Sequence, residues 1–179
     1  MIQRVQSILL LFSAIVMFIF MFVPIWEGTN KPVATEGKSF EGKVKLNAFR
    51  LSVDGIEKNT IKTEFNSKVD ETKKKENLSV IYIAVLAIFS IIISIYSILQ
   101  FKNRLLQMKL GMFNTLLIIG TIGCVFLGIR QGKALLPAIE NDDLMIGFLF
   151  PVVALILNVM ANRFIRNDEK LVKSADRFR

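Results

Sequence analysis

Few side chains in this sequence have the types and spacing that catalysis or metal binding requires. The 179 residues include no His and a single Cys, Cys124, which lies inside an apolar run. This composition excludes a Cys/His zinc site, a histidine general base and an internal disulfide. Gly-rich loops of the P-loop or dinucleotide-binding type are also missing. Carboxylates and amides therefore remain as the candidate groups.

Three carboxylates, Glu140, Asp142 and Asp143, lie close together in the sequence. Carboxylate oxygens are ligands that Ca²⁺ prefers. Their spacing differs from that of a known calcium loop, so a solvated charge cluster is the interpretation we favour. The sequence thus predicts no metal and no cofactor.

Two amides, Asn114 and Asn158, lie within stretches that contain no charged residue. An amide in a membrane helix usually forms a hydrogen bond with a neighbouring helix, which contributes about 1 kcal/mol. Contact with a bound substrate is the alternative. Ion and proton pathways generally need carboxylates, His or Arg inside the membrane. Because these stretches have none, the sequence argues against an ion-coupled transporter, a proton pump and a voltage sensor.

Four stretches without Asp, Glu, Lys or Arg make up nearly half of the chain: Val5–Trp26, Asn77–Phe101, Leu110–Ile129 and Leu144–Asn162. A helix of about 20 apolar residues crosses a bilayer core of about 30 Å. The first stretch is longer than the about 7–15 apolar residues of a signal peptide, so we interpret it as an uncleaved anchor. Trp26 at its end fits the aromatic belt at a membrane surface. We predict an all-α integral membrane protein, a bundle of four transmembrane helices.

The predicted organisation follows from these stretches. Transmembrane helices are expected at 1–26, 77–101, 110–129 and 144–165. The other segments are an extracytoplasmic loop at 27–76, a cytoplasmic loop at 102–109, a second extracytoplasmic loop at 130–143 and a cytoplasmic tail at 166–179.

The basic residues give the expected orientation. Lys and Arg gather densely near the ends of the spans that would be cytoplasmic if both termini are inside, although Lys73-Lys74-Lys75 argues for the opposite. We expect both termini on the cytoplasmic side of the membrane. The net charge of +8 is then attributed to contact with anionic lipids, and no nucleic-acid partner is expected.

The first long loop has the pattern of a small antiparallel sheet. Apolar and polar residues alternate over 43–48, and the apolar phase then shifts by one residue over 49–53, which implies a bulge or turn at the junction. The Asp-Gly pair at 54–55 is a hairpin signal, with a returning strand over 61–65. We expect two to four strands, followed by a charged connection over 66–76. A disordered polar loop is the alternative.

Small residues mark the places where membrane helices approach one another closely. Their spacing within the spans predicts packing faces on three helices. The residues expected at these contacts are Ala87, Ser90 and Ser94 in the second helix, Gly120, Cys124 and Gly128 in the third, and Gly147, Ala154 and Asn158 in the fourth.

The tail combines an apolar stripe with basic residues outside it. It either continues the fourth helix or bends at Asn167-Asp168 and lies on the membrane surface. There each Lys or Arg would gain about 1 kcal/mol from an anionic leaflet. Docking of a protein and simple topogenic charge are the alternatives. The basic residues expected at a lipid or partner are Arg166, Lys170, Lys173 and Arg177.

The tail Asn162–Arg179, the opening Met1–Gln6 and the layout of four spans resemble the Bacteroidota membrane-protein family called domain of unknown function 4293. The resemblance implies an inner-membrane location in a Gram-negative bacterium, and it implies no activity. The architecture is also similar to that of claudin-like proteins, but a shared architecture does not carry a function.

Three functions are compatible with these features. We expect a non-catalytic accessory or scaffold subunit of a membrane assembly, with translocation or another envelope process as its setting, which contacts a membrane-protein partner through the outer sheet and the tail. The alternative is a lipid- or small-molecule-binding protein with a cavity lined by Ser90, Ser94, Asn114 and Asn158. An enzyme is disfavoured because the sequence places no base near the three clustered carboxylates.

Overall fold

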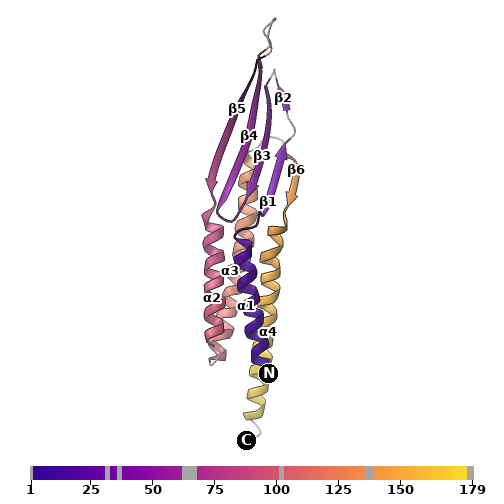
Figure 1. The fold of residues 1–179 in the computed structure, drawn as a ribbon. Helices are drawn as coiled ribbons and strands as arrows, with labels where there is room; N and C mark the ends of the chain where they lie inside the picture. Colours follow the sequence, from indigo (N-terminus) through magenta and orange to yellow (C-terminus); the bar gives the residue numbers. More distant parts are fainter. Residues whose placement is uncertain are drawn as a thin grey trace. The chain divides into compact units, whose positions relative to one another are not determined.

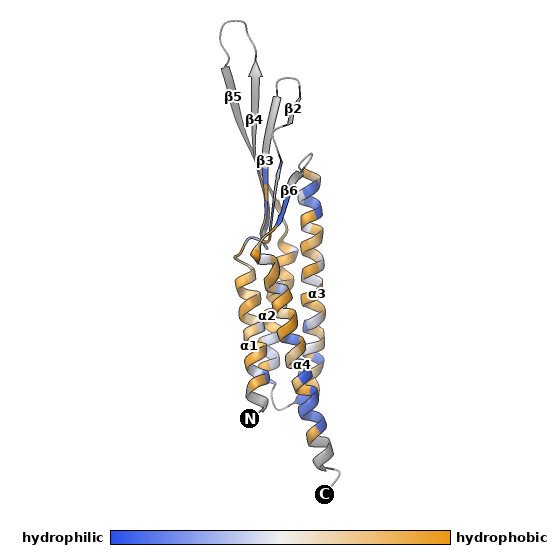
Figure 2. Ribbon diagram, turned by 90° about the vertical axis from the view of Figure 1, so that its right-hand side faces the viewer, coloured by the Kyte–Doolittle hydropathy of each residue, from blue (hydrophilic) through white to orange (hydrophobic). Residues whose placement is uncertain are grey.

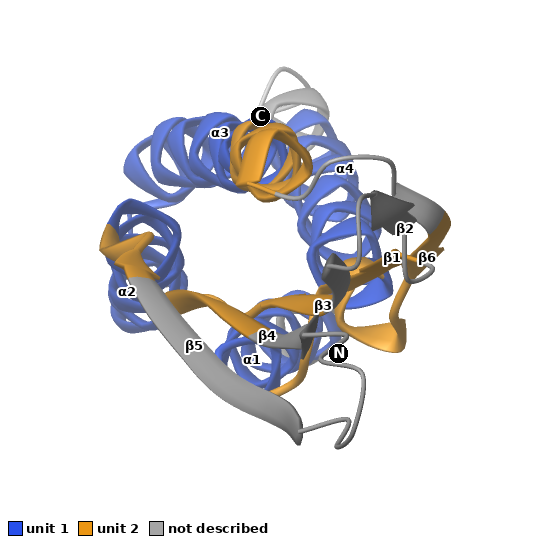
Figure 3. Ribbon diagram, turned by 90° about the horizontal axis from the view of Figure 1, so that it is seen from above, with its two compact units in different colours: residues 1–22, 82–124, 149–179 blue, residues 23–81, 125–148 orange. Residues whose placement is uncertain are grey.

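The computed structural model describes residues 2–30, 33–35, 38–61, 68–100, 103–135 and 139–176. Helices and strands divide between two compact units, which Figure 3 distinguishes by colour. The helical unit comprises Met1–Phe22, Tyr82–Cys124 and Leu149–Arg179, and the sheet unit comprises Val23–Ile81 and Val125–Phe148.

Four α-helices of the described chain run side by side in the helical unit (Figure 1). They are α1 (Ile2–Phe20), α2 (Ile81–Leu99), α3 (Arg104–Leu135) and α4 (Leu149–Asp176). Helix α1 begins and α4 ends at the same end of this unit (Figure 1). Within the described residues, three helical segments are long and apolar enough to cross a membrane, namely α2, α3 and Ile146–Leu171, whereas the apolar part of α1, Val5–Phe20, is shorter. The predicted fold class is thus confirmed as mostly helical, with three helices able to span a membrane.

Helices α3 and α4 extend well past the charge-free stretches from which they were predicted. Helix α3 begins at Arg104, inside the predicted loop 102–109, and ends at Leu135, inside the predicted loop 130–143. Helix α4 continues to Asp176, so most of the predicted tail is a straight continuation of the helix rather than a segment that bends at Asn167-Asp168. Charged residues excluded these segments from the predicted spans, but charge does not interrupt a helix once it has left the apolar layer.

The described part of the sheet unit forms an antiparallel sheet of six strands, more than the two to four expected. The strands are β1 (Trp26–Asn30), β2 (Val33–Thr35), β3 (Lys38–Leu46), β4 (Arg50–Ile61), β5 (Lys68–Ser79) and β6 (Ile139–Leu144). Their order is β5-β4-β3-β1-β6, and β2 pairs with β3. The second predicted loop thus supplies a strand, β6, which pairs with β1. Strands β5 and β6 form the two edges of the main path.

The turn between β3 and β4 lies at the predicted phase change. The backbone N–H of Asn47 donates to the carbonyl of Arg50, with N and O 3.0 Å apart. The predicted hairpin at Asp54-Gly55 is wrong, because both residues lie within β4 opposite Lys43 and Gly42. Once the turn at 47–49 has paired the two strands, a second turn at Gly55 would break the ladder that continues beyond it.

The remaining expectations for this loop have mixed outcomes. Ile61 ends β4 instead of belonging to a returning strand, and Thr63 and Phe65 lie outside the described residues. The predicted charged connection over 66–76 is mostly strand β5, which pairs along its whole length with β4. Its run of lysines lacks the alternation of apolar and polar residues that marks a half-buried strand. The segment is a strand because its backbone pairs with β4.

The core of the sheet unit is built around Trp26, which is fully buried. This position corrects the expectation of an interfacial Trp: β1 carries the indole into the sheet unit, and Asp142 satisfies its N–H. The last turns of α3 pack on the same ring. A Cβ built on Gly132 would lie 2.7 Å from the Trp26 ring and 3.3 Å from Leu51. The absence of a side chain at residue 132 therefore permits this contact.

Candidate functional site

The described helices expose many large apolar side chains and bury several polar ones. Figure 2 shows hydrophobic residues along most of their length. Large apolar residues such as Phe12, Phe89, Leu116 and Ile156 are half or more exposed. The polar residues buried in the helices are Gln6, Ser13, Ser90, Ser94, Ser97, Gln107, Asn114, Thr121, Asn158 and Asn162. This arrangement is typical of membrane helices, and it makes the polar interior the first place to look for a site.

The predicted packing faces of α2 and α4 are buried. Ala87, Ser90 and Ser94 lie on the buried stripe of α2, which also includes Ser97. Ala154 and Asn158 are fully buried on α4. Gly147 is buried in the sheet unit, where a Cβ would lie 2.2 Å from the carbonyl oxygen of Pro24. The buried positions of α2 and α4 recur at spacings of three and four residues, which keep them on one face of each helix. Gly147 lies in the short 3-10 helix Ile146–Phe148, before α4 begins, and not in the fourth helix as predicted.

The buried stripe of α3 follows a different line from the predicted ridge. Gly120 and Cys124 are only partly buried, whereas Gly128 is buried. A Cβ on Gly120 would find only the Leu86 Cδ1 atom, at 4.0 Å, which is ordinary contact. The stripe that is buried comprises Gln107, Gly111, Asn114, Ile118, Thr121 and Val125.

Gly111 is the position of closest approach on α3. A Cβ there would lie 1.8 Å from the Asn162 Oδ1 atom of α4. A substituent at Gly111 would therefore require the Asn162 amide to move, because that side chain occupies the space in which the substituent would stand. Sequence reasoning missed this glycine because it followed the every-fourth spacing of the glycines and the cysteine. Buried residues of α3 recur at alternating spacings of four and three along a line that includes Asn114, and this spacing could have identified Gly111.

A hydrogen-bond network centred on Asn114 links α2, α3 and α4. The Ser90 hydroxyl donates to Asn114 Oδ1 at 2.8 Å. Asn114 Nδ2 donates to Ser94 Oγ at 2.9 Å and to Asn158 Oδ1 at 3.1 Å. All four side chains are fully buried or nearly so. The network therefore replaces water as the partner of these amides.

The same network continues through the amide nitrogen of Asn158. Asn158 Nδ2 donates to the Gly111 carbonyl at 3.0 Å and to Thr115 Oγ1 at 2.9 Å. Thr115 in turn donates to the Gly111 carbonyl at 2.9 Å. Both Asn158 atoms that can bond are thus engaged. The four residues expected to line an internal cavity form hydrogen bonds with one another instead: Ser90, Ser94, Asn114 and Asn158. This arrangement can fix the positions of three helices relative to one another.

A second polar group lies toward the end of the helical unit where α4 ends. Arg104 of α3 and Asp168 of α4 form an ion pair with 3.1 Å between Nη1 and Oδ2. The buried Gln6 Nε2, Ser97 Oγ and Asn162 Oδ1 atoms have no hydrogen-bond partner within the described part of the chain. The sequence analysis did not identify Gln6 and Gln107. Each is followed by a buried residue four positions later and by another three positions after that, and this helical spacing could have identified both as buried.

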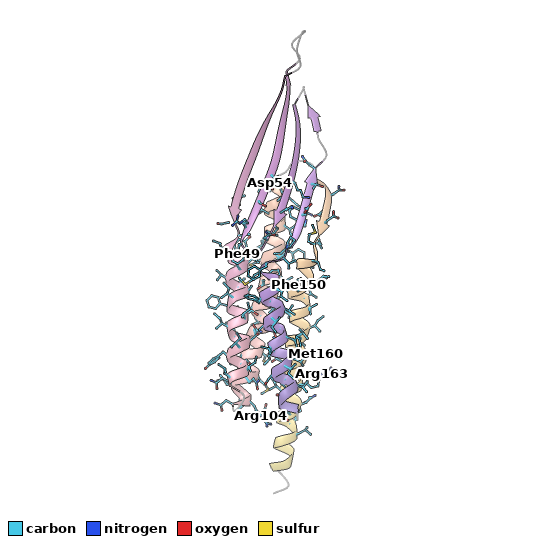
Figure 4. All side chains as sticks on the ribbon, in the orientation of Figure 1. Phe49, Asp54, Arg104, Phe150, Met160 and Arg163 are labelled. Carbon is cyan, nitrogen blue, oxygen red and sulfur yellow. The ribbon has the colours of Figure 1, made fainter. Side chains whose placement is uncertain are left out.

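A groove of about 530 Å³ lies between α3 and α4. Its lining combines apolar side chains with two arginines and an amide: Met112, Thr115, Leu116, Val159, Asn162, Arg163 and Arg166. Figure 4 labels Arg163 and Arg104 toward the end of the helical unit at which α1 begins. The groove is therefore mostly apolar, with positive charge from two arginines.

The four basic residues predicted to bind lipid or a partner are placed only in part. Arg166 is exposed, and its Nη2 atom lies 3.4 Å from Met112 Sδ. Lys170 is exposed on α4. The side chain of Lys173 and all of Arg177 lie outside the described residues. Contact of this basic surface with anionic lipid therefore stays a prediction.

Of the clustered carboxylates of β6, Asp142 has structural partners. Asp142 accepts hydrogen bonds from the Lys133 ammonium group and the Trp26 indole, and the two donors, Lys133 first, hold the pKa of its carboxyl below the usual range. Asp143 is exposed, and the side chain of Glu140 lies outside the described residues. Across the residues that are described, no three Asp, Glu or Cys side chains gather to form a possible metal site.

Comparison with curated proteins gives no match. A family model does match the chain over residues 2–178, which covers α1, the sheet, α2, α3 and α4. The match confirms the resemblance expected from the two termini and extends it across both units. This chain belongs to the family described as domain of unknown function 4293.

Proposed function

We propose that this protein is a non-catalytic accessory or scaffold subunit of a membrane assembly, with its sheet unit as the surface that contacts a partner. The observation that carries the proposal is the network of Ser90, Ser94, Asn114 and Asn158, which satisfies the amides of Asn114 and Asn158 with the protein's own groups. A polar interior used in this way favours a structural role for the helices over a substrate pathway.

The sheet supplies the unpaired bonding groups that an accessory subunit needs. Among the described strands, β5 pairs only with β4 and β6 only with β1, so each has one edge of backbone N–H and C=O groups without a strand beside it. Such edges pair readily with an extended segment of another protein. Strand β5 carries four lysines and three acidic residues, whereas β6 carries three acidic residues and no basic one.

Several features support α1 as a fourth transmembrane helix of the same bundle. Its outward residues are apolar, with Ile8, Phe12 and Phe18 each at least half exposed. The Ser13 hydroxyl donates to the Ala154 carbonyl of α4 at 3.2 Å. An even number of crossings returns the chain to the side on which it started, and α1 begins where α4 ends (Figure 1). We propose that this side is the cytoplasm and that the membrane is a bacterial inner membrane, where basic residues gather on the inner side.

Lysine-directed cross-linking in the native membrane tests the contact surface. Lys45 and Lys133 of the sheet unit have side chains that are nearly half exposed, and Lys109 and Lys170 are exposed on α3 and α4. We expect the two sheet lysines to cross-link to one recurrent partner protein, identified by mass spectrometry after purification in mild detergent. A protein that purifies alone, with cross-links only within its own chain, would contradict the proposal.

Cysteine labelling tests the orientation separately. In a Cys124→Ser background, a membrane-impermeant maleimide applied from outside the inner membrane should label Asn141→Cys on β6. It should not label Asn103→Cys, which precedes α3, until the membrane is opened. Both asparagines are exposed, so a failure to react reports the barrier rather than burial. The reversed pattern would place the termini outside.

A further inference from the structure

We propose that the groove between α3 and α4 is a binding site for one anionic phospholipid, whose phosphate lies at Arg163 and Arg166 and whose acyl chain follows Met112, Leu116 and Val159. The site goes beyond the scaffold role and does not depend on it. It also differs from a general attraction of the basic tail to the membrane, because it is a defined groove in one unit of the fold.

The charge of the groove selects an anionic occupant. Its lining contains two arginines and no carboxylate. Arg163 and Arg166 are three residues apart on α4, so they lie on one face, and both are exposed. The guanidinium of Arg166 has the Met112 thioether 3.4 Å away, which is a weak acceptor. Asp168 two residues farther on is paired with Arg104. A phosphate group is the ligand that two guanidinium groups match best.

The position of the arginines fits a lipid headgroup. Arg163 is the first charged residue after the charge-free stretch Leu144–Asn162, so it lies where an apolar layer ends. From Arg166 back to Val159 the helix rises by about 10 Å, which takes the groove from the headgroup level into the acyl region. Met112, Leu116 and Val159 are exposed along this path and offer an acyl chain apolar contact.

The groove also contains a buried polar group without a protein partner. Asn162 lines the groove and is 8% exposed, and its Oδ1 atom has no hydrogen-bond donor among the described residues. A hydroxylated headgroup or a water molecule held beneath the lipid would supply such a donor. This feature distinguishes the groove from an ordinary lipid-facing furrow, whose walls would be wholly apolar.

Native mass spectrometry of the full-length protein, released from nanodiscs of mixed phosphatidylglycerol and phosphatidylcholine, tests the site. We expect one retained phosphatidylglycerol on the wild type. The double variant Arg163→Gln/Arg166→Gln should bind it about thirtyfold more weakly, since each arginine near an anionic lipid contributes about 1 kcal/mol. The matched control Lys109→Gln/Lys170→Gln removes the same charge at exposed positions outside the groove and should change binding less than threefold.

A second variant tests the acyl path without changing charge. Leu116→Trp fills the groove from its exposed wall and should also lose the retained lipid, while thermal unfolding in detergent reports that the protein remains folded. Equal loss in the lysine control would reduce the effect to general charge and overturn the proposal. Equal retention of phosphatidylcholine would overturn it as well. Loss of a protein partner from the arginine variant, with phosphatidylglycerol unaffected, would assign the groove to that partner instead.

Discussion

Replacement of Asn114 by alanine is the perturbation that tests the helical interior most sharply. The Asn114 amide makes three side-chain hydrogen bonds, with Ser90, Ser94 and Asn158. Hydrogen bonds between membrane helices contribute about 0.6 kcal/mol each, with a maximum near 1.7. We therefore expect Asn114→Ala to lower the free energy of unfolding by about 2 kcal/mol. The serines lose little more, because a serine hydroxyl can return to a carbonyl of its own helix.

The assay is reversible unfolding in mixtures of mild detergent and dodecyl sulfate, followed by helical circular dichroism. Phe113→Ala is the matched control, since Phe113 is adjacent in sequence and 53% exposed. It should cost less than about 0.5 kcal/mol, as surface changes usually do. A double-mutant cycle of Asn114→Ala with Asn158→Ala isolates their shared bond, with an expected coupling of about 0.6 kcal/mol. Equal cost for Asn114→Ala and Phe113→Ala, or zero coupling, would refute the reasoning.

Three further predictions concern single positions. Gly111→Ala should destabilise the helical unit in the same assay, because its Cβ would lie 1.8 Å from an amide oxygen of α4, whereas Gly120→Ala, with 4.0 Å of space, should be neutral or stabilising. Asp142 stabilises the sheet unit through its lowered pKa, so that contribution is complete above the unfolded value of about 3.9 and is lost as pH falls through the folded value. Asp142→Asn should therefore remove the part of the stability that is lost in acid, measured by acid unfolding followed through Trp26 fluorescence. An acid-unfolding midpoint unchanged from the wild type would contradict this. Gly132→Ala should expose or displace Trp26, whose ring is 2.7 Å from the new Cβ, and shift its emission to the red.

The packing faces of α2 and α4 could be predicted because their signal is local. Small and polar residues recur at spacings of three and four within charge-free stretches, and those residues are buried. On α3 the same method followed Gly120 and Cys124, whereas burial follows Asn114. A glycine has no side chain that stabilises a contact, so regularly spaced glycines mark a helix contact only where a neighbouring helix packs against them. The buried amide does need a partner, and its position therefore identifies the contact face.

The sheet was predicted in kind but not in extent. The turn at 47–49 follows from a phase change that only local residues determine. Strand β6 cannot be predicted in this way, because it pairs with β1 across a sequence separation of more than a hundred residues. The same pairing carries Trp26 into the core, although its place at the end of an apolar stretch indicated a membrane surface. The groove of Arg163 and Arg166 likewise depends on the placement of α3 against α4.

Hydrogen exchange of side-chain amides tests the central claim most directly. Asn114 and Asn158 form hydrogen bonds with the protein rather than with water or a passing substrate. In nuclear magnetic resonance spectra of the detergent-solubilised protein, their Nδ2 protons should therefore exchange with D₂O far more slowly than those of the exposed Asn103 and Asn141. Exchange at Asn114 and Asn158 as fast as at these two references would show a hydrated passage through the helices and contradict the account.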